Sequence, residues 1–216
     1  MEWLIILIVS LSLMVLLYKW NKHALKRRRQ LLIDTYSFPK SISEKVSVKY
    51  PHLSDDELHL VINGLREYFH ICNIAGKKVV SMPSQVVDVA WHEFILFTEQ
   101  YSFFCKKAMG RFLHHTPAEA MKKPTLAQLG IKRAWRISCQ RNGIDHKAAT
   151  SLPILFSIDS MLKIDDGFKY SLDCTKKGGR DNCASHIGCT SGCTGSSFGD
   201  SGSDGGSSCG GGCGSS

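Results

Sequence analysis

Residues 84–105 read SQVVDVAWHEFILFTEQYSFFC and contain the clearest periodic pattern in the chain. Largely apolar residues recur there at alternating steps of four and three: Val87, Trp91, Phe94, Thr98, Tyr101 and Cys105. Such steps place side chains on one face of an α-helix. Ser84 directly follows Pro83, and serine is a favoured helix N-cap. The stretch therefore predicts one continuous helix that begins near Ser84, runs through Cys105 and can end at Gly110.

Further helical patterns lie on both sides of this stretch. Ser54 and Glu57 are spaced as a capping box, and the apolar periodicity that follows ends at Gly76. Helices are also predicted from about Thr125 to Asn142 and within residues 152–162, LPILFSIDSML. Residues 41–49, SISEKVSVK, indicate either a short strand or an irregular linker. Because strand signals are few, the predicted fold class is mainly α.

The amino-terminal residues predict a single transmembrane helix. Residues 3–17 read WLIILIVSLSLMVLL, and Tyr18 and Trp20 follow where aromatic rings favour the membrane interface. At about 1.5 Å per residue, residues 1–20 can span about 30 Å, one hydrocarbon core. A cleaved signal peptide is the alternative. It is less favoured because Glu2 is the only charged side chain before the run and no small-residue cleavage pattern follows.

A basic stretch follows the apolar run and contains no acidic residue: Lys19, Lys22, Lys26, Arg27, Arg28 and Arg29. Positive residues next to a membrane helix stay in the cytoplasm, so we expect the amino terminus outside and the body cytoplasmic. Next to a bilayer these charges would bind anionic lipid headgroups. Nucleic acid is a less favoured partner because no aromatic residue beyond Trp20 interleaves the stretch.

The composition divides the chain into blocks. Of its 216 residues 43% are apolar, and the formal net charge is +8, which excludes a fully disordered chain, a collagen or a small disulfide knot. We expect a transmembrane anchor over 1–20, a basic juxtamembrane linker over 21–50, a helical domain over 51–167 and a tail over 168–216. Between Cys174 and Ser216 lie 13 Gly, 10 Ser and 6 Cys, which predicts a disordered Gly/Ser/Cys-rich tail. A metal-binding or redox tail is the alternative.

Ligand-type side chains concentrate in residues 88–117. They comprise imidazoles, a carboxylate and a thiol, which are the usual ligands of a transition metal such as zinc: Asp88, His92, Cys105, His114 and His115. Asp88 and His92 are four residues apart, so both can point the same way from a helix. On an unbroken helix Cys105 would lie about 220° around from His92. A shared site therefore needs a break near Thr98, or it omits Cys105.

A purely structural role for these residues is the alternative. Tyr101 and Cys105 would then lie in the core, His92 would pair with Asp88 at the rim, and the two later histidines would bond within the following turn. A nucleophilic Cys105 paired with a histidine is disfavoured, because a thiol on an apolar stripe keeps a high pKa. The motifs GxGxxG, Walker A and G-x-S-x-G are absent from the sequence, which gives no support to an enzyme.

The residues Trp91, His92, Leu96, Tyr101, Cys105 and Gly110 follow the pattern W-H-x-H-x-L-x4-Y-x3-C-x4-G, apart from its second histidine. In this pattern the chain resembles the glycine-rich domain-containing protein-like family over about residues 79–164. The second histidine of the family pattern is Phe94 here, which removes one metal ligand. No enzymatic activity is firmly attached to that family, so the resemblance gives no reaction to assign to this chain.

Two functions are compatible with these features. The favoured one is a non-enzymatic, membrane-anchored interaction or scaffold module that docks an unidentified protein partner. The alternative is a metal-binding or redox protein that uses the His/Cys cluster of the helical domain. The alternative requires some of the candidate side chains to converge within about 4–5 Å, because metal–ligand bonds are about 2 Å long.

Overall fold

The structure is a computed structural model that describes residues 2–115, 124–172 and 182–183. These residues form seven helices: α1 (Glu2–Thr35), α2 (Lys40–Lys49), α3 (Asp55–Ala75), α4 (Gln85–Leu96), α5 (Thr98–Ala108), α6 (Pro124–Arg141) and α7 (Ile154–Met161). Two short strands, β1 (Tyr170–Ser171) and β2 (Asn182–Cys183), pair in parallel. The predicted mainly α fold class is confirmed.

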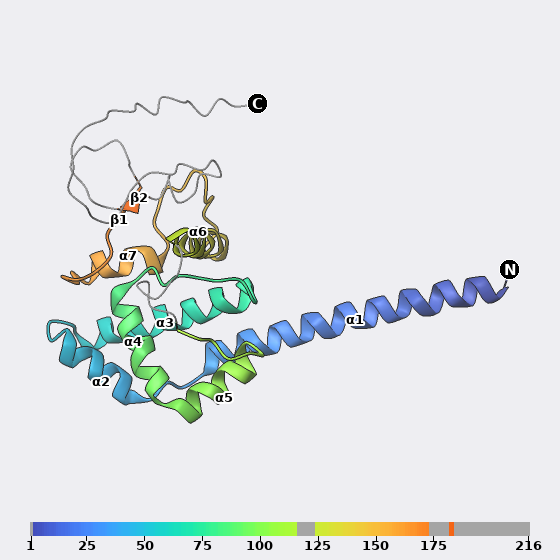
Figure 1. Cartoon of the computed structure of the whole chain (residues 1–216), viewed down its shortest axis with the longest axis horizontal. Helices are drawn as coiled ribbons and strands as arrows, with labels where there is room; N and C mark the ends of the chain where they lie inside the picture. Colours follow the sequence, from blue (N-terminus) through green and yellow to red (C-terminus); the bar gives the residue numbers. More distant parts are fainter. Residues whose placement is uncertain (1, 116–123, 173–181, 184–216) are drawn as a thin grey trace.

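Helix α1 leaves the rest of the molecule as a long rod (Figure 1). Its 34 residues extend about 50 Å at the usual helical rise. All side chains from Glu2 to His23 are exposed. Within the described residues, α1 is the one helix that is long and apolar enough to cross a membrane. A signal sequence near the amino terminus has the same properties, and the orientation of the body stays a prediction.

The carboxyl-terminal end of α1 is part of the folded body. Ile33 is completely buried, and the guanidinium of Arg66 on α3 donates hydrogen bonds to the carbonyls of Ile33 and Tyr36. Asp34 accepts a 2.6 Å hydrogen bond from Nε2 of His70, also on α3. The helix therefore continues without interruption from its apolar segment into the core.

The strand or irregular linker predicted over residues 41–49 is wrong, because these residues form α2. Ile42 and Val46, four residues apart, are fully buried, whereas Val48 is 77% exposed. Alternation would have buried Val48 together with Val46, whereas a helix buries every third or fourth residue. The composition-based boundaries of the linker and helical domain stay predictions, although Ile33, Ile42 and Val46 lie in one core with residues after 51.

Aromatic side chains from three helices meet in the centre of the body. The ring of Phe104 on α5 lies 4.8 Å from that of Phe69 on α3 and 5.5 Å from that of Phe94 on α4, measured between centroids. Tyr36 and Phe38 from the α1–α2 connection pack onto the same rings. This cluster fixes α3, α4 and α5 against the base of α1.

The predicted continuous helix over residues 84–105 is wrong at one position. The backbone leaves helical geometry at Phe97, with φ −79° and ψ 61°, and this separates α4 from α5. Phe94, Tyr101 and Cys105 on the two sides of the break are all buried. The periodic stripe therefore identified buried positions correctly but did not reveal the break.

Several predicted helix ends are confirmed. Ser54 and Glu57 form the capping box of α3, and Gly76 follows its last turn with φ +63°. Helices α6 and α7 lie where the sequence predicted them. At the start of the expected tail, the Phe168 amide donates a hydrogen bond to buried Asp159. The rest of the predicted tail, apart from the backbone of 182–183, lies outside the described residues.

Candidate metal centre

The amino-terminal end of α4 is fixed by a buried carboxylate. Asp159 on α7 accepts hydrogen bonds from the Ser84 hydroxyl at 2.7 Å, the Gln85 amide at 2.7 Å and the Val86 amide at 3.2 Å. The Ser84 hydroxyl in turn accepts from the Val87 amide. These bonds satisfy the free amides of the first helical turn. They hold the helix in position for the two ligand-type side chains that follow, Asp88 and His92.

The segment after α5 folds back along α4 and brings a third ligand-type side chain to it. The chain turns at Gly110, which has φ +69°, and continues through buried Leu113 to His115. The Tyr101 hydroxyl donates to the Leu113 carbonyl and accepts a 3.1 Å hydrogen bond from Trp91 Nε1 on α4. Burial raises the pKa of Tyr101, so this hydroxyl keeps its proton. These bonds fix the Leu113–His115 segment relative to α4.

Asp88, His92 and His115 converge at this junction. Nε2 of His115 lies 3.1 Å from Oδ1 of Asp88, and Nδ1 of His92 lies 3.5 Å from Oδ2. The two imidazole centroids are 4.2 Å apart. One ligand atom from each of the three residues lies within 4.8 Å of the other two, and no other such group occurs among the described residues.

The site has a closed side and an open side. The indole of Trp91 packs edge-on to the ring of His115, with 4.5 Å between centroids. The side chains of His115 and Asp88 are 14% and 20% exposed, whereas that of His92 is 48% exposed. A small ion can therefore reach the three ligand atoms from the side of His92.

Two of the five predicted site residues do not join this group. The ring of His114 is exposed and lies 4.8 Å from the ring of Phe112. Cys105 is completely buried in the core, and burial raises the pKa of its thiol. The break at Phe97 does not bring Cys105 to the site. Tyr101 and Cys105 thus have the core positions that the structural alternative assigned to them, and His92 pairs with Asp88 as that alternative expected.

The donor set fits a small transition-metal ion. Two imidazole nitrogens and one carboxylate are ligands that zinc accepts, with bonds of about 2.0–2.1 Å. In a tetrahedral site such bonds place neighbouring ligand atoms about 3.3 Å apart. The observed nitrogen–oxygen distances of 3.1 and 3.5 Å lie close to this value. The same distances also suit a direct hydrogen bond or ion pair between Asp88 and each imidazole.

Comparison with known proteins identifies a family. A model of the UCP032817-like family matches residues 28–190, which is 163 of the 216 residues. The chain belongs to the UCP032817-like family. The resemblance to the glycine-rich domain-containing protein-like family is therefore wrong: the motif that suggested it is short, whereas the UCP032817-like match covers three quarters of the chain. No curated protein and no solved structure matches the chain.

The UCP032817-like match begins at Arg28, before the last two turns of α1. It thus includes the part of α1 that packs into the body, in addition to the three converging residues. Sequence reasoning missed Asp159, which fixes the start of α4, and it assigned Trp91 to the apolar stripe without placing it beside His115. Asp159 left one signal, because it is the single charged residue in the apolar run at 152–162.

Proposed function

We propose that this protein is a membrane-anchored metal-binding module. In this proposal the apolar part of α1 crosses the bilayer, and the helical body binds one zinc ion through Asp88, His92 and His115. The observation that carries the proposal is the convergence of three ligand atoms within 4.8 Å from two segments of the chain. This convergence is the condition that the sequence set for a metal site.

The surrounding contacts support the site. His115 comes from a segment that two hydrogen bonds of Tyr101 fix to α4, and Asp88 contacts both imidazoles. Three protein ligands leave one tetrahedral position for water or for a side chain of a partner. If a protein partner supplies this fourth ligand, the zinc ion would also bind that partner to the body. The metal site would then serve the interaction role that the sequence favoured.

The proposal includes no chemical reaction. The three cysteines whose side chains the structure describes, Cys72, Cys105 and Cys139, are buried. Burial raises the pKa of Cys72 to about 12 and that of Cys139 to about 11. Such thiols are poor nucleophiles and poor redox groups at neutral pH. The redox version of the alternative function therefore has no support from these three residues.

Metal analysis of the full chain in detergent tests the metal centre. Serine replaces the six cysteines from Cys174 to Cys213, because free thiols would bind zinc independently. We expect one zinc per chain, lost in both His92→Ala and His115→Ala. His114→Ala is the matched control, since it removes an exposed imidazole next to the site and should retain the zinc.

Two results would contradict the metal centre. One is a purified chain that takes up no zinc, cobalt or nickel at near-stoichiometric concentration. The other is a His115→Ala variant that binds metal as tightly as the parent chain. Either result would leave the interaction module without a metal as the function to pursue.

The membrane anchor has its own test. Mass spectrometry of the mature protein, extracted from membranes in its own cell, should find the peptide that contains residues 1–20. A mature chain that begins after Trp20 would identify the apolar run as a signal sequence. It would contradict the anchored part of the proposal but not the metal centre.

A further inference from the structure

We infer that the end of the body next to the membrane is a docking surface for anionic lipid headgroups, formed by α1 together with two loops that are distant in sequence. We call this surface the basic collar. It goes beyond the metal centre and shares with the proposed function only the membrane anchor. The sequence predicted lipid contacts for the basic stretch of α1, and the structure adds the two loops.

Three segments of the chain form the basic collar: 19–31, 76–82 and 104–112. They contain eleven lysines and arginines and not one acidic residue: Lys19, Lys22, Lys26, Arg27, Arg28, Arg29, Lys77, Lys78, Lys106, Lys107 and Arg111. None of these eleven side chains forms an ion pair within the described part of the chain. Their charge exceeds the formal net charge of the whole protein, which is +8.

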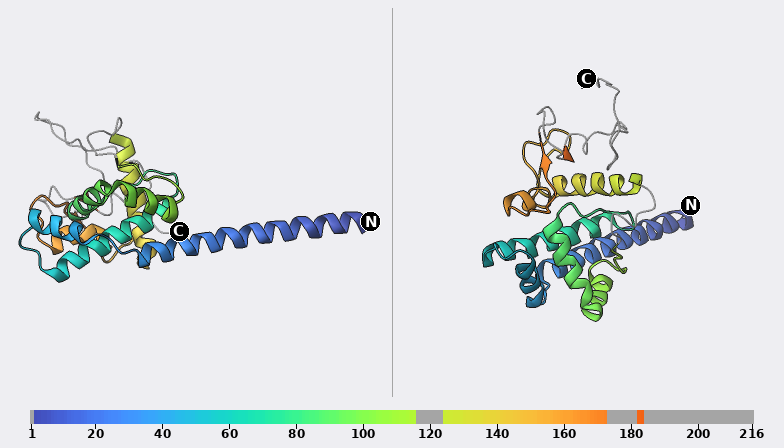
Figure 2. Two further views of the ribbon diagram at one scale, coloured as in Figure 1. Left: turned by 90° about the horizontal axis from the view of Figure 1, so that it is seen from below. Right: turned by 60° about the vertical axis from the view of Figure 1, so that its left-hand side comes forward.

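Direct contacts join the three segments. The guanidinium of Arg29 lies against Gly110, so closely that a Cβ at Gly110 would overlap it. The guanidinium of Arg111 donates a hydrogen bond to the carbonyl of Gly76. The loop after α5 therefore connects α1 on one side to the loop after α3 on the other. In both figures these loops lie at the end of the body from which α1 leaves (Figures 1 and 2).

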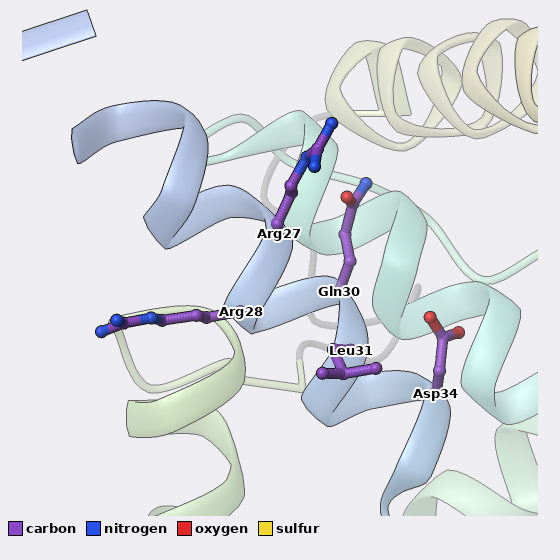
Figure 3. A pocket seen from close by; sticks show the side chains of 5 residues that line it. All are labelled: Arg27, Arg28, Gln30, Leu31 and Asp34. Carbon is purple, nitrogen blue, oxygen red and sulfur yellow. The ribbon is translucent and has the colours of Figure 1, made fainter. Parts of the chain in front are cut away.

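The cations of α1 extend to more than one side of the helix. Arg27 and Arg28 line a shallow hollow on α1 together with Gln30, Leu31 and Asp34. Figure 3 shows Arg28 reaching out above α5, while Arg27 and Gln30 rise on the side of α3. Because α1 contacts both α3 and α5, these side chains continue the surface formed by the two loops.

The collar lies within reach of a bilayer whose interface is at Trp20. Nine residues of helix separate Trp20 from Arg29, which is about 13 Å. A headgroup layer covers about 5–7 Å of that distance, and the surface potential extends a further 8–10 Å into the solution. This potential can therefore reach exposed Lys77 and Lys78 in the loop after α3, and exposed Lys106 and Lys107 at the end of α5, even when α1 stands upright in the membrane.

The distribution of charge along α3 also favours an orientation in which the collar faces the bilayer. Its first turn contains Asp55, Asp56 and Glu57, and the residues just after its last turn are Lys77 and Lys78. Its 21 residues separate these ends by about 30 Å. The acidic end lies away from the free part of α1 and the basic end lies next to it (Figure 1). An anionic bilayer attracts the near end and repels the far one.

A fluorescence experiment on the full chain tests the collar. The chain is inserted through α1 into nanodiscs of phosphatidylcholine alone or mixed with phosphatidylserine, with a quencher on a fraction of the headgroups. A fluorophore on a cysteine introduced by Val79→Cys reports the distance of the loop from the headgroups, and serine replaces the six cysteines from 174 onwards. Recovery of the chain with the discs establishes insertion in every sample.

We expect strong quenching with phosphatidylserine and weak quenching without it, reversed by raised salt. The pair Lys77→Glu and Lys78→Glu should lower the ratio of docked to undocked body by about thirtyfold or more. The control pair Lys40→Glu and Lys45→Glu makes the same charge change at exposed lysines of α2 and should leave the quenching unchanged.

Equal quenching with and without phosphatidylserine, in chains that are inserted, would overturn the inference. So would a charge-reversed loop that stays quenched. A single-stranded RNA is added to chains in neutral nanodiscs as a competing ligand. If this RNA binds the collar while phosphatidylserine does not increase the quenching, the collar is assigned to nucleic acid instead. None of these outcomes depends on the metal centre, which the zinc measurements test separately.

Discussion

Nε2 of His115 lies 3.1 Å from Oδ1 of Asp88, although 27 residues separate the two in the chain. The contact depends on a short segment after α5 that has no regular secondary structure of its own. What fixes this segment is the Tyr101 hydroxyl, which is bonded on both sides. The properties of the candidate metal centre should therefore depend on a residue that does not touch it.

Tyr101→Phe tests this dependence. The variant leaves the Trp91 Nε1–H and the Leu113 carbonyl without their shared partner, which should destabilise the fold by about 1–3 kcal/mol. We also expect zinc affinity to fall about 10- to 100-fold, as for other residues that orient metal ligands. Isothermal titration and urea unfolding of the full chain in detergent, with serine in place of the six cysteines from Cys174 to Cys213, measure the two effects.

Tyr68→Phe is the control for Tyr101→Phe. It also removes a buried hydroxyl, but one that donates to the Val80 carbonyl and has no bond to the segment of His115. It should reduce stability without reducing zinc affinity. Equal losses of affinity in the two variants would mean that Tyr101 acts only through overall stability.

His70 should make the stability of the body depend on pH. Burial is the largest cause that lowers the pKa of this imidazole below its ordinary value of 6.5, followed by the charge of Arg141, and the hydrogen bond to Asp34 only partly opposes them. Below about pH 6.5 the unfolded chain takes up a proton there that the folded chain resists. The contribution of neutral His70 to the free energy of unfolding is therefore complete above about pH 6.5 and is lost as the pH falls below that value.

Unfolding in urea at pH 7.5 and 5.5 measures this contribution. We expect the parent chain to lose stability on acidification, and the loss to be smaller in His70→Gln, which has no proton to take up. A parent chain that becomes more stable at pH 5.5, or a variant with the same slope, would contradict the assignment. Both chains contain the eight other histidines, so the difference between their slopes removes the contribution of these residues to the pH dependence.

Asp159→Ala should be among the most destabilising single changes in the body. The carboxylate is 3% exposed and accepts hydrogen bonds from Ser84, Gln85, Val86 and Phe168. Removing it leaves the buried Ser84 and Val86 donors and the partly buried Gln85 and Phe168 amides unpaired, at a cost of about 3 kcal/mol or more. Asp159→Asn, which retains one carbonyl oxygen, should lie between parent and alanine variant.

Thermal unfolding of the two Asp159 variants, followed by circular dichroism, measures the order of stability. Asp165→Ala is the control because this acid is exposed, and it should change stability by about 0.5 kcal/mol or less. If Asp159→Ala unfolds at the parent temperature, the carboxylate does not fix the start of α4.

The buried thiols should resist alkylation in the native state. Cys72, Cys105 and Cys139 are buried, and burial raises the pKa of each. We expect iodoacetamide at pH 7.5 to leave all three unmodified in the folded chain and to modify all three in urea, as read from peptide masses. Modification of native Cys105 at the rate of a free thiol would contradict its place in the core and restore it as a candidate nucleophile.

Local signals were sufficient to predict much of the helical structure. Ser54, Ser84 and Gly76 act through hydrogen bonds and backbone angles within one turn of a helix, so neighbouring residues reveal them. Asp88 and His92 were paired for the same reason, because helical spacing alone places them together. The break at Phe97 has no Gly or Pro to mark it. On the two sides of the break, Phe94 and Phe104 pack together in the aromatic cluster. This is a tertiary contact that local sequence patterns do not reveal.

The features that were missed depend on contacts between distant segments. The alternating spacing of apolar residues between Ile42 and Val48 is also typical of a strand. Only the tertiary structure shows that Val46 is buried and Val48 is exposed, as expected for a helix. The sequence shows that His115 can bind a metal ion. Whether it lies next to Asp88 or next to Cys105 depends on how the chain turns at Gly110. The same holds for the basic collar, since only the contacts of Arg29 and Arg111 bring its loops beside α1.

The unbroken course of α1 has a mechanical consequence. No residue between Trp20 and Ile33 departs from helical structure, and Ile33 is locked in the core. In a membrane, the body would therefore follow every change in the tilt or rotation of the buried segment as a rigid lever would. A partner helix or a thicker bilayer that tilts α1 would swing the open side of the Asp88–His92–His115 site toward or away from the lipid surface without any contact with the site itself.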